Sequence, residues 1–231
     1  MSSPPAGPAS VAFCPCPPLL LPEVAGRAAA DTAALRAACA AAVDALVAGR
    51  PDAVVLVGPG ARGRYRPGDG GDFRGFGVDL AVPLDGAARP DGRRLPLSLT
   101  VGAWLLDRAG YAGPRVGAAP EEVAAAVADL PGRTGLLVMG DGSARRSEKA
   151  PGHLDPAAGP FDAAVAAALA RGDAAALAAL DPAEGERLLA AGVPAWRAAG
   201  ALLAGRDVDA ALLLDAAPFG VGYLVASWTA A

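Results

Sequence analysis

Two apolar segments of strand length constrain the fold of this chain most strongly. Residues 53–57 (AVVLV) and 134–140 (TGLLVMG) are almost continuously apolar, with no alternation of apolar and polar positions. A strand of this kind is buried on both faces, as in a parallel sheet that lies between two layers of helices. We therefore predict an α/β protein, a three-layer α/β/α domain with a central, mostly parallel or mixed sheet.

Other segments fit the same architecture. Asp31 and Gly49 bound an alanine-rich segment with apolar residues at helical spacing, which predicts a helix over 32–48 capped by Asp31. Further strands are expected at 11–14, 76–82, 209–214 and 221–228, and further helices at 99–110, 120–130, 161–171, 173–180, 183–191 and 194–204. A length of 231 residues suits one large core, so we expect a disordered lead-in over 1–10 and a single domain over 11–231.

Charge and hydropathy disfavour several classes of partner. The formal net charge of -4 argues against a nucleic-acid surface, because phosphate binding needs clustered Lys and Arg. No segment reaches the roughly 18 uninterrupted apolar residues of a membrane span. The first ten residues, MSSPPAGPAS, lack the features of a signal peptide. We expect a cytoplasmic protein with no nucleic-acid or membrane partner, whose three cysteines form no disulfide framework.

A glycine motif follows the strand predicted at 53–57. Gly58, Gly60 and Gly63 have the G-x-G-x-x-G spacing of a dinucleotide-binding turn. That turn requires a helix to begin inside the glycine run, whereas the next residues, RYRPGDGGD, cannot be helical. We therefore interpret this segment as a glycine-rich surface loop.

The sequence MGDGS at 139–143 presents polar groups at the end of a predicted central strand. Open α/β sheets bind ligands at this edge, so Asp141 and Ser143 are candidate catalytic or binding residues. A serine nucleophile would need a base, and the only histidine in the chain is His153, in the loop that follows. There is no G-x-S-x-G elbow, so the alternatives are a cap or turn role for Ser143 and a loop role for His153.

Two cysteines follow the first predicted strand. Cys14 and Cys16 would form part of a metal or redox site only if Cys39, His153 or carboxylates supplied further ligands. A C-x-C pair alone is a weak motif. Burial as small apolar residues is the simpler interpretation of the cysteines.

Three segments distributed along the chain together indicate a family. They are CPCPPLLLPEV (14–24), MGDGSARRSEKAPGHLDPAAGPFD (139–162) and APFGVGYLVASW (217–228). In this order the chain resembles the class III extradiol ring-cleavage dioxygenase superfamily, particularly its uncharacterised bacterial branch. The resemblance implies an α/β/α domain in which two histidines and a carboxylate hold Fe(II), which binds a catechol and dioxygen, while a further histidine acts as acid and base.

The positions at which that family carries histidines hold other residues here. Cys16, the Pro59-Gly60 pair and Ala144 stand at these positions, and His153 falls where relatives tend to carry an aromatic residue. One histidine cannot supply two ligands and an acid/base. We therefore expect no cofactor, neither Fe(II) nor another, and a catalytically degenerate domain.

The leading hypothesis is an oligomeric, degenerate domain whose cleft binds a small molecule or a partner subunit. The cleft should be lined by Cys16, Gly60, Asp141, Gly142 and Ser143, with His153 at its rim. One alternative is an active metal-dependent oxidoreductase, resembling an aromatic ring-cleavage dioxygenase. Its atypical or inter-subunit site would use Cys16 and His153 with Asp141 or Asp215, a set that favours zinc over iron. Another is a structural partner of an enzyme, with the cleft filled by side chains.

Overall fold

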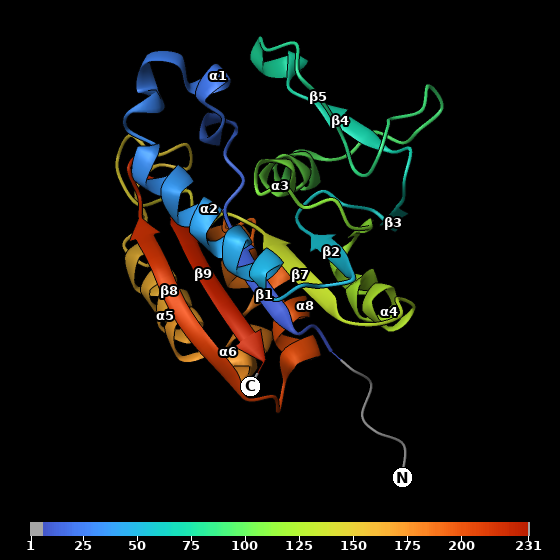
Figure 1. The fold of residues 1–231 in the computed structure, drawn as a ribbon. Helices are drawn as coiled ribbons and strands as arrows, with labels where there is room; N and C mark the ends of the chain where they lie inside the picture. Colours follow the sequence, from blue (N-terminus) through green and yellow to red (C-terminus); the bar gives the residue numbers. More distant parts are fainter. Residues whose placement is uncertain (1–6, 231) are drawn as a thin grey trace.

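A seven-stranded mixed sheet organises the chain (Figure 1). The computed structural model describes residues 7–230. In spatial order the strands are β3 (Arg64–Tyr65), β6 (Arg115–Ala118), β2 (Ala53–Val57), β7 (Thr134–Met139), β1 (Ser10–Cys14), β9 (Tyr223–Ala230) and β8 (Val208–Ala216). The four strands β6, β2, β7 and β1 are parallel to one another, whereas β3 and β9 run antiparallel to their neighbours. The predicted α/β class with a mixed sheet is confirmed.

Helices cover both faces of this sheet (Figure 1). Side chains of α2 (Ala33–Ala48) and α3 (Leu97–Arg108) share one core with the sheet, and those of α4 (Val123–Ala128), α5 (Ala158–Arg171), α6 (Ala174–Ala178) and α8 (Val193–Leu203) share the other. The short helices α1 (Pro22–Ala25) and α7 (Pro182–Arg187) lie in connections. A small second sheet, β4 (Gly70–Asp72) with β5 (Ala81–Pro83), precedes α3. Single 3-10 turns occupy Pro18–Leu20, Gly26–Ala29, Arg74–Phe76 and Pro120–Glu122.

Each central strand contributes side chains to both cores. In β2, Val54 and Leu56 pack with α2 and α3, whereas Val55 and Val57 pack on the opposite face. All five residues of this strand are buried. This two-sided burial is the reason that the segment is apolar throughout instead of alternating.

The last strand is fixed in the sheet by an aromatic pair. The indole of Trp228 meets the ring of Phe13 edge-on, with ring centroids 4.9 Å apart. Its Nε1 donates a 2.7 Å hydrogen bond to the Leu169 carbonyl of α5. Trp228 is 1% exposed, so the indole joins β1, β9 and α5 while its one polar atom is satisfied.

Several sequence predictions differ from the structure. The pattern at 76–82 predicts one strand, but only Ala81–Pro83 forms one, because Gly75 and Gly77 place a 3-10 turn before it. The helix predicted over 32–48 begins at Ala33 after Thr32, with no side-chain cap, so Asp31 does not cap it. The segment at 120–130 is shorter than expected, with a 3-10 turn leading into α4.

The amino-terminal boundary is partly defined. Strand β1 begins at Ser10, and the Ala9 amide already donates to the Thr134 carbonyl at 2.8 Å. Most of the lead-in predicted over 1–10, namely residues 1–6, lies outside the described residues. Between residues 7 and 230 no helix has both the length and the apolar character to cross a membrane.

The aromatic pair predicts a stability effect. Trp228→Ala should lower the free energy of unfolding by about 3–5 kcal/mol, because it opens a cavity between β1, β9 and α5. Leu213→Ala on β8 is the control, since Leu213 is 39% exposed and its truncation should cost less than about 1 kcal/mol. Urea unfolding of both variants measures the difference. Equal losses would show that the indole does not anchor β9.

Candidate functional site

Two loops that follow parallel strands meet at the carboxyl edge of the sheet. Asp141 lies two residues after β7, and Cys16 lies two residues after the adjacent β1. The carboxylate oxygen Oδ1 of Asp141 accepts a 2.7 Å hydrogen bond from the backbone N–H of Cys16. The Gly140 amide donates to the Cys14 carbonyl at 2.9 Å, which continues the strand pairing into these loops. The structure therefore brings together two of the residues singled out from the sequence.

Asp141 is poorly solvated for a carboxylate. Its side chain is only partly exposed, and among residues 7–230 the Cys16 amide is its one hydrogen-bond donor. Burial raises the pKa of Asp141 from 3.8 to about 6, although the Cys16 N–H opposes that shift by stabilising the anion. The second oxygen, Oδ2, is thus left as a strong acceptor at neutral pH.

The groups around this carboxylate are weak acids that stay protonated. Burial, the charge of Asp141 and the proximity of Cys39 raise the pKa of the Cys16 thiol well above its usual value. Burial, with the charges of Asp141 and Cys16, also raises the pKa of the Tyr223 phenol. Tyr223 opens β9, which runs antiparallel to β1, so its ring reaches the same edge. A thiol and a phenol that remain neutral can donate hydrogen bonds near Asp141 but cannot act as anionic nucleophiles at neutral pH.

The remaining cysteines belong to the core. Cys14 and Cys39 are at most 1% exposed, and all three cysteines are free thiols. The hydrogen bond from Cys14 and burial raise the pKa of the Cys39 thiol. Their environment is that of small buried side chains.

Ser143 is part of a buried structural network. Its backbone N–H and its Oγ each donate to the Asp162 carboxylate, at 2.8 and 2.9 Å. Arg146 completes an ion pair with the same carboxylate at 3.0 Å, and Asp162 is fully buried. The Ser143 hydroxyl is thereby occupied by Asp162, which fits a turn-anchoring role better than that of a nucleophile.

The Asp162 network explains two glycines of the sequence segments at 139–162 and 217–228. A Cβ at Gly142 would lie 2.8 Å from Oδ1 of Asp162, and one at Gly222 would overlap Oδ2. The two loops also exchange backbone hydrogen bonds, from Gly142 to Gly222 at 2.7 Å and from Gly222 to Ser143 at 2.8 Å. Only glycine fits at these two positions while the carboxylate keeps its partners.

The other candidate residues lie outside this arrangement. His153 is exposed, has a positive φ of 59°, and its Nδ1 lies 3.0 Å from the Glu148 carbonyl. Asp215 is partly exposed on β8, opposite Leu224. Gly60 follows β2 and approaches Pro96 at the start of α3.

The residues present do not fit the Fe(II) that the family resemblance implies. Throughout the part of the chain that the structure describes, no three His, Cys, Asp or Glu side chains are grouped so that they could hold a metal ion. The raised pKa of Cys16 further disfavours the thiolate that an atypical site would require. No step through a metal is derived from this site.

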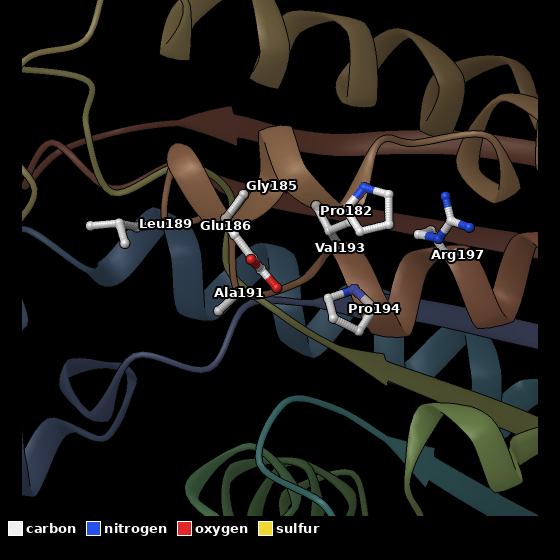
Figure 2. Close-up of a pocket in the computed structure, with 9 residues that line it drawn as sticks. Pro182, Gly185, Glu186, Leu189, Ala191, Val193, Pro194 and Arg197 are labelled. Atoms are coloured by element: carbon white, nitrogen blue, oxygen red, sulfur yellow. The ribbon is translucent and has the colours of Figure 1, made fainter.

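A separate apolar groove lies between α7 and α8 (Figure 2). Its volume is about 500 Å³. Figure 2 shows Pro182 and Pro194 along it, with the charged ends of Glu186 and Arg197 at different points of its length. Leu189, which is 47% exposed, lines it as well. The Gly192 amide donates to the Asp141 carbonyl at 2.8 Å, so the loop before α8 rests on the loop that carries Asp141.

The sequence was compared with protein-family models and with curated proteins, and neither comparison gave a match.

Two residues of this edge were missed from the sequence. Asp162 occurs in the quoted segment 139–162, but a lone acidic residue in a helix gives no sign that it will be buried. Tyr223 follows the glycines of the FGVGY segment, and only the antiparallel placement of β9 brings it to the edge. Neither role could be inferred from local spacing.

Removal of the buried carboxylate should be strongly destabilising. Asp162→Ala leaves the Ser143 donors and the Arg146 guanidinium without their acceptor, which should cost about 3–5 kcal/mol. Ser143→Ala is the matched variant, because it removes one hydrogen bond and should cost about 1 kcal/mol. Urea unfolding measures both values. A loss below that of Ser143→Ala would show that Asp162 does not hold the two loops together.

Asp141→Asn should stabilise the protein in a pH-dependent way. The folded wild type holds its proton up to a pKa of about 6, whereas the unfolded chain releases it near 3.8, so ionisation of Asp141 opposes folding as pH rises between these values. Asn keeps the acceptor for Cys16 without the charge. We expect a gain of about 1–3 kcal/mol at pH 7.5 that disappears by about pH 4.

Thermal or urea unfolding of wild type and Asp141→Asn across this pH range tests the expectation. Asp215→Asn, which removes a partly exposed carboxylate on β8, is the control and should follow the wild type. A gain for Asp141→Asn that does not change with pH would contradict the assignment.

Proposed function

We propose that this chain is an extradiol-dioxygenase-like domain that binds a small molecule at its strand-end site without cleaving an aromatic ring. The proposal rests mainly on one observation, the partly exposed carboxylate of Asp141 with one oxygen bonded to Cys16 and the other free. A carboxylate in this setting has lost much of its hydration, so a ligand group that donates to Oδ2 regains an interaction that water supplies poorly.

The surroundings favour a particular ligand chemistry. The anion would accept from a phenolic hydroxyl or pair with an ammonium group, since both carry donors that match a free carboxylate oxygen. Cys16 and Tyr223 stay neutral beside it, so they add no repulsion toward an uncharged aromatic ring. Catechols and aromatic amines are therefore the classes to test first.

The absence of iron ligands among the described residues supports binding in preference to oxygenase chemistry. Ring cleavage in the family depends on Fe(II), and the positions of its histidines hold Cys16, Pro59-Gly60 and Ala144 here. Asp141, with its pKa of about 6, could accept a proton from a bound phenol, but residues 7–230 offer no metal-binding cluster to activate dioxygen.

A second candidate function is that of a structural partner. It is favoured by how completely side chains fill this edge: Cys16 is 6% exposed, Tyr223 is 4% exposed and Ser143 is fully buried. In that case the Asp141 edge would pair with a donor from another subunit, and the free chain would bind no small molecule.

A binding titration separates these functions. Tag-free protein is titrated with catechol and with benzylamine while backbone amide NMR signals are followed. We expect saturable shifts at Cys16, Gly142 and Tyr223, and affinity at least about tenfold weaker in Asp141→Asn, as for loss of one charge-assisted hydrogen bond. Asp215→Asn should bind as the wild type does.

Two results would count against small-molecule binding here. If neither probe shifts these amides, the structural-partner function is favoured. If Asp141→Asn binds both probes as tightly as the wild type, Asp141 does not belong to the site. Iron near one equivalent in protein expressed with iron supplementation would instead support a metal-dependent oxidoreductase.

A further inference from the structure

A cavity rich in arginine lies at the other end of the carboxyl edge, beside β3 (Figure 1). Its volume is about 540 Å³. The lining comes from two loops, one running through β3 and one preceding α3, together with Glu122. The arginines that line it are Arg64, Arg66, Arg89 and Arg93.

One carboxylate holds the two loops together. Oδ2 of Asp69 accepts from the Arg66 N–H at 2.9 Å, and Oδ1 accepts from the Arg93 N–H at 2.8 Å. The Arg89 N–H donates to the Gly68 carbonyl at 2.8 Å, and a Cβ at Gly92 would overlap that same oxygen. The backbones that carry Arg66, Arg89 and Arg93 are therefore fixed relative to one another, although their side chains are exposed.

The charges of the four arginines are not equally compensated. Arg64 forms ion pairs with Glu122 at 3.2 Å and Asp129 at 2.5 Å. Arg93 donates only to backbone carbonyls, those of Arg64 at 2.7 Å and of Arg62 at 2.8 Å. Its guanidinium also lies 4.2 Å from the centre of the Tyr65 ring, so within the described residues its position is fixed but no acidic side chain is paired with its charge.

Arg66 and Arg89 are the free cations of the cavity. Within residues 7–230 neither guanidinium forms a hydrogen bond or ion pair with another side chain or with the backbone. Three guanidinium groups that lack an acidic partner among these residues thus converge on one cavity, in a chain whose net charge is -4. Like charges placed together in this way repel one another, and a bound anion removes that repulsion.

We propose that this cavity binds a small anion of the diphosphate class. Guanidinium forks donate two parallel hydrogen bonds to phosphate oxygens, and Arg66 and Arg89 are free to do so while Arg93 supplies a fixed positive charge. The volume suits a small molecule, and the acidic chain around the cavity disfavours a long nucleic acid. The site shares no side chain with the Asp141 site, so it stands or falls separately from the proposed function.

The test uses the full chain and inorganic pyrophosphate in a low-salt buffer without divalent metals. Amide NMR signals of Arg66, Asp69 and Arg93 should shift saturably. The double variant Arg66→Gln with Arg89→Gln should bind about tenfold more weakly or worse, because two charge-assisted contacts are lost. The matched control is Arg74→Gln with Arg171→Gln, which removes two exposed arginines that pair with Asp79 and Asp173 and do not line the cavity.

Citrate provides the comparison of ligand class. Pyrophosphate should bind more tightly than citrate if the arginines are arranged for phosphate oxygens. Citrate that binds as tightly, shifts spread over the whole surface, or a double variant that binds pyrophosphate within about twofold of the wild type would each overturn the proposal. Far-ultraviolet circular dichroism confirms that each variant is folded before it is compared.

Discussion

The buried carboxylate of Asp162 is the interaction on which the candidate site depends. It accepts from both donors of Ser143 and from Arg146, and it requires glycine at positions 142 and 222. The loop after β7 is thereby joined to the loop before β9. Asp141 lies within the first of these loops and Tyr223 directly after the second, so their positions at the sheet edge follow from a network that takes no part in binding.

The edge of the sheet therefore carries two carboxylates in opposite situations. Asp162 is fully buried with each of its oxygens bonded, which makes it structural. Asp141 is partly exposed with one oxygen bonded, and its raised pKa shows that folding leaves it short of partners. A folded chain that keeps a poorly compensated charge at such a position gives up stability there, which is typical of a site retained for binding.

The sequence predicted the layered fold because burial of a strand on both faces leaves a readable apolar run. It also placed Asp141 and Cys16 at strand ends, which parallel strand order brings to one edge. Strand β6 was missed because it is short and opens with Arg115, which is buried only through its ion pair with Asp107 at 2.6 Å. The partners of Ser143 and the convergence of Arg66, Arg89 and Arg93 depend on loops distant in sequence, which no local pattern encodes.

The central claim is that folding deprives the Asp141 carboxylate of solvation at the edge of the sheet. The most direct test is an NMR titration of the side-chain carboxyl carbons of carbon-13-labelled protein, with Asp141→Asn used to assign the Asp141 signal. The account predicts a pKa of about 6 for Asp141, well above the ordinary aspartate value of 3.8. A titration midpoint at the ordinary value would show a well-solvated carboxylate and would contradict the account.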